Sequence, residues 1–511
     1  MTDRAPPEQP ARRRAVAQSA ALLLAPWLST RGSAASTGPR FALGVASGQP
    51  RPDGMVLWTR LTGEGLADRV AVRWEIAHDE AFARLVAHGV EVAEAAWAHS
   101  VHAEPAGLAP ERSYWYRFIA LGEVSAVGRT RTAPAPDAAA TLDLVTASCQ
   151  RYDAGHYAAW RQVARDDVDL VLFLGDYIYE SASPRQALRR HEGGRAATLD
   201  QYRARYATYK SDPALQAAHA ACPWLLVWDD HEVANDYAGL NGPASDAGFA
   251  AQRAAAYQAY WEHQPFQKAL RPRGPKMRIV GRCDWGRLAR IHLLDDRQYR
   301  DPQACSGAHG GSRVLTRTDC AELDDPARSL LGAEQERWLA GGWDLARPWN
   351  VVAQQTLMAR FAAPGAEGGE PRVWTDGWDG YPAARRRLLG QVAERALGGV
   401  VVVGGDVHAS YVADLKTDFG DPRGKVVATE FCGTSITSPS LAQARIDAIA
   451  RFNPHVRHAR ADRRGYTRLR FGPERMHAEL RVVEDVMDPA STVSTAARFA
   501  VDAGRPGVLV D

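Results

Sequence analysis

The sequence predicts an α/β layered fold preceded by a small all-β sandwich. From residue 141 onward, short apolar runs alternate with stretches of helical periodicity, which is typical of sheets covered by helices. From Val70 to Ala77, apolar and polar residues alternate with the period of a half-buried strand. Residues 132–140 are rich in Pro and Ala and suit an interdomain linker. We therefore expect a sandwich over residues 38–132 and a larger domain over residues 141–505.

The expected sandwich carries one further signature. Leu108 and Pro110 stand shortly before Tyr114 and Tyr116. This arrangement is typical of the tyrosine corner at the turn into a late strand of Ig-like and fibronectin-type sandwiches.

Residues 1–36 have the layout of a cleaved export signal. Arg12, Arg13 and Arg14 precede a mildly apolar stretch over residues 15–28, and small residues follow at 32–35. Consecutive arginines before a weak apolar stretch resemble a twin-arginine signal, which is read by export machinery for folded proteins. The alternative is a disordered basic tail. We expect a periplasmic or secreted protein.

Composition and charge exclude several classes of protein. The 511-residue chain has a formal charge of +2, and residues 1–35 carry five Arg against two acids, which leaves −1 for the remainder. A near-neutral body argues against a nucleic-acid-binding patch, because such binding rests on clustered basic charge. No apolar run reaches the roughly 18 residues of a transmembrane segment.

The six cysteines are too few and too scattered for a disulfide scaffold. Cys305 and Cys320, fifteen residues apart around a Gly-rich loop, can close one bridge outside the cytoplasm. Cys149 is a candidate for a metal-bound thiolate.

Seven buried strands are expected in the larger domain, and four of them end in polar clusters. The strands are 142–147, 170–174, 224–228, 291–294, 351–353, 400–403 and 426–428. The clusters are Ser148-Cys149, Asp176 with Tyr179, the run WDDHEVAND over 228–236, and Asp406 with His408. Reactive groups favour such strand ends, because the strand fixes the position and the loop exposes the side chain.

These clusters supply Asp, Asn, His, Cys and Tyr side chains. That set fits a multinuclear site that combines iron with a harder cation better than it fits structural zinc. Asp176 is a hard oxygen ligand that can bridge two cations, and Tyr179 can serve as a phenolate beside a trivalent metal. The alternatives are a structural Cys or Tyr and, for WDDHEVAND, an exposed charged loop.

The order and wording of these motifs resemble the alkaline phosphatase D family of metallophosphoesterases. The resemblance spans about residues 40–505. The matching motifs are FALGVASG, DGMVLWTRL, ASCQ, FLGDYIYE, WDDHEVAND, DRQYR, DGWDGY, GGDVHAS and EFCGTS. The resemblance implies a four-layer metallophosphoesterase core of two packed sheets flanked by helices. It also implies a secreted hydrolase that acts on phosphodiesters and phosphomonoesters with Fe³⁺ and Ca²⁺.

The resemblance also implies the ligands. Cys149, Asp176, Tyr179 and His408 would hold the iron. Asp230, Asn235 and Asp406 would complete the calcium side, with Asp176 as the bridge. The resemblance does not divide these last residues between the two cations.

Three further residues are candidates for catalysis. His231 follows an expected ligand, where an imidazole can contact the phosphoryl group or protonate the leaving oxygen. Its alternative is a structural histidine. Arg297 and Arg385 can grip phosphate oxygens, although salt bridges with acids such as Asp295, Asp296 or Asp379 explain both equally well. The spacing assigns no role to Asp376, Trp378 or Tyr381.

The leading hypothesis is a secreted metal-dependent phosphoesterase whose substrates are small-molecule or polymeric phosphoesters. One alternative is a phospholipase D-like enzyme that acts on phospholipid head groups, although no basic amphipathic helix marks an interfacial anchor. The other alternative is a non-catalytic secreted protein that binds a surface. The presence of all the expected ligand types argues against this last reading.

Overall fold

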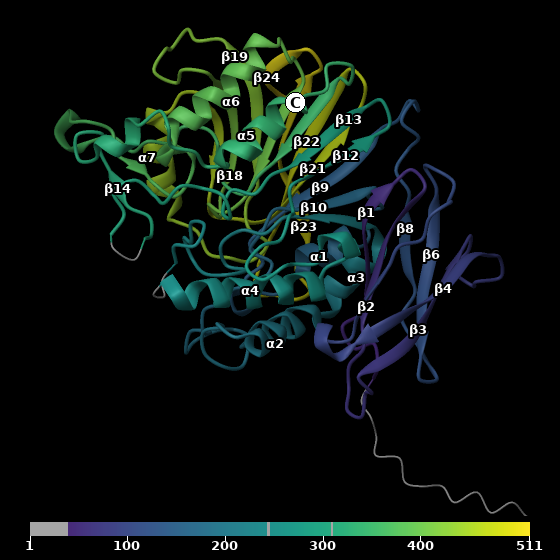
Figure 1. Cartoon of the computed structure of the whole chain (residues 1–511). Coiled ribbons are helices and arrows are strands. Elements are labelled where there is room, and N and C mark those ends of the chain that lie inside the picture. The colour runs from purple at the N-terminus through teal and green to yellow at the C-terminus, as the bar shows by residue number, and fades with distance from the viewer. Residues whose placement is uncertain (1–38, 243–245, 308–309) are drawn as a thin grey trace, which may run out of the picture. The chain divides into compact units, whose positions relative to one another are not determined.

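The computed structural model describes residues 39–242, 246–307 and 310–511. The predicted export signal over residues 1–36 lies outside these ranges. In the described body, two large sheets pack against each other and helices cover their outer faces (Figure 1). An all-β region precedes this core in the chain. The predicted fold class is therefore confirmed.

The first large sheet has ten strands in the order β24-β23-β22-β21-β9-β10-β11-β1-β2-β5. Its parallel centre consists of three predicted strands, β9 (Leu142–Ala147), β10 (Leu170–Phe173) and β11 (Pro223–Leu226). The outer strands are β21 (Arg464–Phe471), β22 (Arg475–Val483), β23 (Val493–Asp502) and β24 (Arg505–Val510) on one side, and β1 (Val45–Arg51), β2 (Gly54–Arg60) and β5 (Ser100–Ala103) on the other.

The second large sheet has seven strands in the order β12-β13-β15-β17-β19-β18-β20. In β17, Val401 and Val403 belong to the core shared with the first sheet, whereas Val400 and Val402 pack toward helices. A strand covered on both faces needs a continuous apolar run, which explains the sequence VVVV. The strand bounds are β12 (Gly281–Trp285), β13 (Ala289–Leu293), β15 (Trp349–Ala353), β17 (Val400–Gly404), β18 (Ser410–Lys416), β19 (Val426–Cys432) and β20 (Val456–Arg460).

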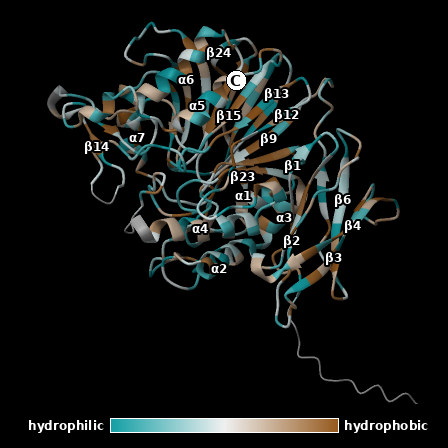
Figure 2. Cartoon of the chain, in the orientation of Figure 1, coloured by the Kyte–Doolittle hydropathy of each residue, from teal (hydrophilic) through white to brown (hydrophobic). Residues whose placement is uncertain are grey.

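Two groups of helices form the outer layers. Trp160, Leu215 and Tyr257 anchor the first group in the core of the ten-stranded sheet. Leu389 and Ile446 anchor members of the second group in the core of the seven-stranded sheet. The first group is α1 (Ala158–Val163), α2 (Leu199–Lys210), α3 (Pro213–Ala221) and α4 (Asp246–His263), and the second is α5 (Gly332–Ala340), α6 (Pro382–Glu394) and α7 (Gln443–Phe452). Many strands between these layers are hydrophobic (Figure 2).

The amino-terminal β region shares a sheet with the larger domain. One layer consists of β3 (Arg69–Ala77), β4 (Leu85–Glu94), β6 (Ser113–Ala120), β7 (Glu123–Val124) and β8 (Gly128–Arg131). It packs against β1, β2 and β5, and β1 in turn pairs in parallel with β11. The hydroxyl of Tyr114 accepts a hydrogen bond from the Ala109 amide at 2.9 Å, as a tyrosine corner requires.

A smaller two-stranded sheet joins β14 (Val314–Leu315) to β16 (Val373–Trp374). Next to it, Cys305 and Cys320 form a disulfide with a Cα–Cα distance of 6.0 Å, which confirms the predicted bridge. No helix in the described ranges is long and apolar enough to cross a membrane.

Candidate metal centre

The four polar clusters predicted at strand ends meet at one place between the two sheets. They follow the carboxyl ends of β9, β10, β11 and β17. Two glycines allow the loops to approach closely. A Cβ on Gly175 would lie 2.4 Å from the Cβ of Asp229, and one on Gly405 would lie 2.4 Å from the Oγ of Ser148. Any larger residue would push the loops apart.

Five acidic, thiol or imidazole residues at this place have positive φ angles. They are Cys149 (59°), Asp176 (57°), Asp236 (57°), Asp406 (64°) and His408 (54°). Non-glycine residues seldom adopt this left-handed conformation, which costs free energy that the surrounding structure must supply. Such strain is typical of sites where a side chain must point in one fixed direction.

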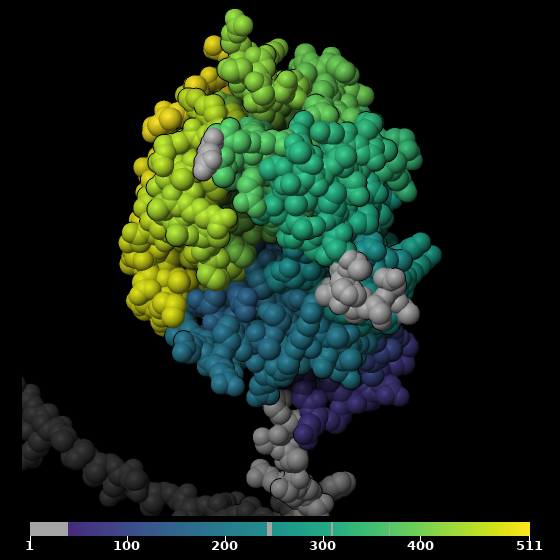
Figure 3. Space-filling model, turned by 90° about the vertical axis from the view of Figure 1, so that its left-hand side faces the viewer, coloured from purple at the N-terminus to yellow at the C-terminus, as the bar shows by residue number. Residues whose placement is uncertain are grey.

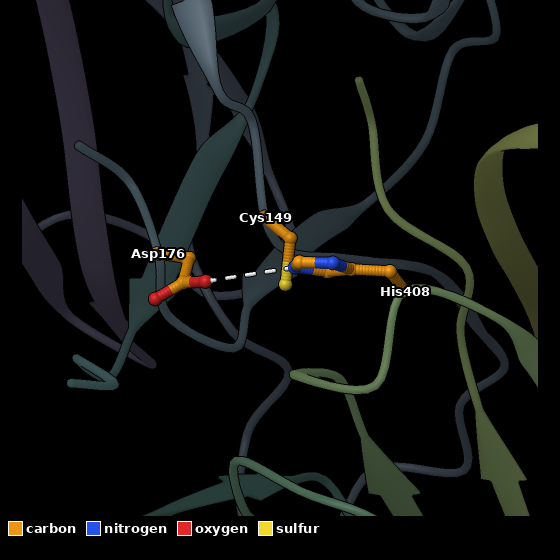
Figure 4. A group of neighbouring side chains, drawn as sticks. All are labelled: Cys149, Asp176 and His408. Atoms are coloured by element: carbon orange, nitrogen blue, oxygen red, sulfur yellow. Dashed lines mark ion pairs between the residues drawn. The ribbon is translucent and has the colours of Figure 1, made fainter. Parts of the chain in front are cut away.

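The first group consists of Cys149, Asp176, Tyr179 and His408. Their side chains converge from three loops, and Figure 4 shows the thiol, the carboxylate and the imidazole. The Tyr179 hydroxyl lies 2.7 Å from Asp176 Oδ2 and 3.1 Å from His408 Nε2. The Nδ1–H group of His408 donates to the Pro439 carbonyl at 2.8 Å, so its Nε2 lone pair faces the group. The four residues expected to hold iron are therefore in one place.

The thiol and the phenol of this group keep their protons when no cation is bound. Burial, reinforced by the nearby Asp176 carboxylate, raises the pKa of the Cys149 thiol well above its ordinary value. The same two causes raise the pKa of Tyr179. A thiolate and a phenolate can form here only if a cation neutralises them.

A second group contains Asp176, Asp230 and His231, so Asp176 belongs to both groups. Burial raises the pKa of Asp230 to about 6. Asp230 Oδ1 and Asp406 Oδ2 are buried and have no hydrogen-bond partner among the described residues. Buried carboxylate oxygens without donors are the ligands that a hard cation requires, so these residues fit calcium.

Asn235 follows the same strand end as Asp230 and His231. It is exposed, and its backbone amide donates to Glu180 Oε1 at 3.2 Å. Asp236, to which the sequence assigned no role, groups with Asp230 and Asp376. The acidic cluster at this place therefore includes two residues, Asp236 and Asp376, that were not among the expected ligands.

Glu232 connects the loops that carry the two groups. Its carboxylate accepts backbone N–H bonds from Asp176 at 3.0 Å, Asp229 at 2.8 Å and Tyr177 at 2.5 Å. Burial raises the pKa of this carboxyl to about 8. No local sequence signal distinguishes Glu232 from its acidic neighbours, because its partners lie on two different loops.

His231 is held by a residue that sequence reasoning left without a role. The Nδ1–H group donates to Glu180 Oε2 at 2.7 Å, and the imidazole packs on the Tyr179 ring with centroids 4.1 Å apart. Asp176, Asp230 and Glu180 raise the pKa of His231 against the opposing effect of burial. The His231 side chain keeps 15% of its surface exposed, so its other nitrogen can meet a ligand from solvent. Figure 3, which views the molecule from the left-hand side of Figure 1, shows a hollow between yellow-green and green segments.

Arg297 is buried among carboxylates. It pairs with Asp229 and with Asp376, the latter at 2.5 Å, and lies 3.5 Å from Asp406. The predicted alternative of a salt bridge therefore describes Arg297, although its partners differ from Asp295 and Asp296. Asp376 also accepts from Arg300 at 2.8 Å, so it is part of the same ionic network.

Arg385 lies apart from this network. Its guanidinium donates to Asp379 at 2.7 Å and to the Met358 carbonyl at 3.0 Å, and the described residues give it no contact with the candidate metal-binding groups. Trp378 donates to Gln354 at 2.9 Å and Tyr381 to the Asp301 carbonyl at 2.6 Å, which are structural contacts.

Arg151 is a further residue to which the sequence assigned no role. Its guanidinium lies 5.2 Å from the centroid of the Tyr179 ring, and its Nε donates to Asp153 at 2.7 Å. Its two terminal nitrogens have no hydrogen-bond partner within the described ranges. The position two residues after Cys149 is the only sequence signal that could have found it.

Candidate metal-binding side chains gathered at the carboxyl ends of strands from two packed sheets are typical of the metallophosphoesterase class. The chain belongs to the PhoD-like phosphatase family, whose model matches residues 144–480, while the model of the amino-terminal domain of PhoD-like phosphatases matches residues 27–134. This result confirms the family resemblance and identifies the protein as an enzyme of a phosphatase family.

Two relatives are similar over most of the chain. Alkaline phosphatase D of Bacillus subtilis (strain 168) is 42% identical over 487 residues, which cover 92% of this chain and 82% of that protein. The solved structure of PhoD is 41% identical, has a TM-score of 0.87, and is matched over 94% of this chain and 93% of that chain.

A third relative shares the fold only. The purple acid phosphatase PPD1 of yellow lupin (Lupinus luteus) is 12% identical, with a TM-score of 0.55 over 90% of this chain and 74% of that chain.

Proposed function

We propose that the protein is an exported phosphoesterase that hydrolyses phosphodiesters and phosphomonoesters with one ferric ion and calcium at the site described above. The observation that carries the proposal is the convergence of a thiol, a phenol, a carboxylate and an imidazole at Cys149, Tyr179, Asp176 and His408. The phenol and the thiol favour a trivalent iron, and the all-oxygen side at Asp230, Asn235 and Asp406 favours calcium.

When bound, the two cations supply Lewis-acid stabilisation of the phosphoryl oxygens and lower the pKa of the attacking water. The residues of the chain position the substrate and supply the proton that the leaving oxygen needs. The water oxygen forms the new bond to phosphorus while the bond to the leaving oxygen breaks, and His231 gives its Nε2 proton to that leaving oxygen. Glu180 keeps the His231 ring in the orientation this transfer needs.

Arg151 is the arginine best placed to bind the phosphoryl group. Arg297 already pairs with four carboxylates, and Arg385 with Asp379. Arg151 keeps two terminal nitrogens beside Tyr179 for the non-bridging oxygens of a substrate. The role that the sequence suggested for Arg297 and Arg385 is therefore assigned to Arg151 in this proposal.

Selective removal of calcium tests the function. Chelation should abolish turnover of a phosphodiester and leave iron in place, and Asp230→Ala should have the same effect. Glu394→Gln, an exposed change on α6, is the control that should behave as wild type. Unchanged rates after exhaustive calcium chelation would contradict the assignment.

Export is tested separately by amino-terminal sequencing. Extracytoplasmic protein should begin near Ala35 or Ser36. Material that retains Met1 would contradict export by a cleaved signal.

A further inference from the structure

An arginine-rich cavity lies outside the metal centre. Its volume is about 320 Å³, and none of its lining residues belongs to the metal-ligating groups. Its walls are the first turn of α6, the loop between β18 and β19, and the segment around β14 and β16; of these elements, Figure 1 labels α6, β14, β18 and β19. The cations that line it are Arg317, Arg360, Arg385 and Arg386.

The acids that line the cavity already have donors. Asp379 accepts from the Arg385 guanidinium at 2.7 Å and from a backbone amide at 2.8 Å. Glu370 accepts from the Thr318 amide at 3.0 Å, and Asp418 from the Gly420 amide at 2.7 Å. The carboxylates that line the cavity are therefore already hydrogen-bonded to the surrounding protein.

Two of the arginines are left over. Arg360 is half-buried and Arg386 is exposed, and the guanidinium group of neither has an ion-pair or hydrogen-bond partner in the part of the chain that the structure describes. Burial lowers the pKa of Arg360, and the neighbouring Arg385 and Arg317 add to this effect while Asp379 opposes it. An anion bound between these side chains would relieve the repulsion.

The cavity is also held in shape. Leu323 and Val373, which line it, pack in a small core with Cys320, and Cys320 is cross-linked to Cys305. On the opposite side, the Arg385 guanidinium lies 4.9 Å from the centroid of the Phe419 ring. A preformed wall lowers the entropic cost of binding a ligand.

We propose that this cavity binds a multiply charged phosphate-type anion through Arg360 and Arg386, at a site separate from the metal centre. Guanidinium groups suit such an anion because they donate paired N–H bonds to its oxygens. The volume accommodates a phosphate group with a small organic substituent. This site goes beyond the proposed catalytic function and does not depend on it.

Calorimetric titration of the metal-loaded enzyme with inorganic phosphate, at physiological ionic strength, tests the proposal. Wild type should show two classes of site, one of which is lost when the metals are removed. Arg386→Glu should lower the affinity of the other class of site for phosphate about tenfold or more, since the loss of a hydrogen bond to a charged group reduces affinity by about that factor. Arg395→Glu, an exposed charge reversal at the far end of α6, is the matched control.

Arg386 is exposed, so its replacement should not disturb folding; Arg360→Ala gives an independent second variant. Hydrolysis of 4-nitrophenyl phosphate should be unchanged in both, which separates this site from catalysis. A single class of site in wild type, or two classes that persist in both variants, would overturn the proposal.

Kinetics distinguish two sources of the anion. If the ligand is free phosphate, Arg386→Glu should relieve that part of the inhibition by phosphate that does not compete with substrate. If the ligand is a phosphate within a larger substrate, the same variant should raise the KM for long-chain polyphosphate only.

Discussion

The Nδ1 atom of His231 lies 2.7 Å from Oε2 of Glu180, and the two residues come from loops that follow the adjacent strands β10 and β11. A histidine held at one nitrogen by a carboxylate presents the other nitrogen in a fixed direction and tautomer. Because β10 and β11 are neighbours in the sheet, Glu180 can hold Nδ1 of His231 and leave Nε2 free to carry the proton that is donated.

Glu180→Gln should lower kcat about 10- to 100-fold, the usual effect of removing a group that orients a catalytic side chain. The loss should be greater for an alkyl phosphodiester than for a nitrophenyl ester, with metal content unchanged. Glu192→Gln, an exposed change in the same segment, should have no effect. Equal losses on both substrates would mean that Glu180 acts on folding rather than on His231.

His231→Ala should lower the rate of hydrolysis of an alkyl phosphodiester roughly 10²- to 10⁴-fold, which is the range of general-acid catalysis. A nitrophenyl leaving group is already a stable anion, so activity on the aryl ester should fall far less. Steady-state rates on both substrates and metal analysis of the variant check this prediction. Loss of bound metal would instead make His231 a ligand or the support of a ligand.

Arg151→Gln should raise the KM for phosphoesters about tenfold, because one charge-assisted hydrogen bond to phosphate is lost. Arg151→Lys should recover part of the affinity, since the ammonium keeps the charge but not the paired donors. Arg165→Gln, an exposed arginine on the following segment, is the control. Unchanged kinetics in Arg151→Gln would assign the phosphate contact to another residue.

The affinity of the metal-free protein for iron should rise with pH. The raised pKa values of Cys149 and Tyr179 mean that both groups are protonated at neutral pH, so metal binding must release their protons. Each proton released on binding adds one unit to the slope of the logarithm of the affinity against pH. Tyr179→Phe removes one of these protons, so it should lower that slope by one unit. Titrations across the neutral range measure the slope, and an affinity independent of pH would contradict this protonation scheme.

The sequence identified the strand ends because their signals are local. Apolar runs such as VVVV before Gly404 and Gly405 indicate both a buried strand and the tight exit that places Asp406 and His408. The strand β22 carries an equally clear signal, the alternation of Met476, Ala478, Leu480 and Val482 with polar residues, so this outer strand of the sheet was also predictable.

Contacts between loops were beyond local patterns. Glu232 is distinguished from the neighbouring acids only by the three backbone amides that donate to it. Arg297 is distinguished from other arginines only by the carboxylates that surround it. Both depend on how strands distant in the sequence are ordered in the sheet, which no run of residues encodes. The same reason explains why the sequence offered both Arg297 and Arg385 for phosphate binding, although Arg385 pairs with Asp379, away from the ionic network of Arg297.

The most direct test of the central claim is the visible absorption spectrum of purified protein, recorded with its metal content, for wild type and Tyr179→Phe. Wild type should contain one iron per chain and show a charge-transfer band from phenolate and thiolate bound to iron(III). Tyr179→Phe should bleach or shift that band, while the exposed Tyr299→Phe should leave it unchanged. A colourless and fully active preparation that contains only zinc would contradict the assignment of Cys149, Asp176, Tyr179 and His408 as the ligands of a ferric ion.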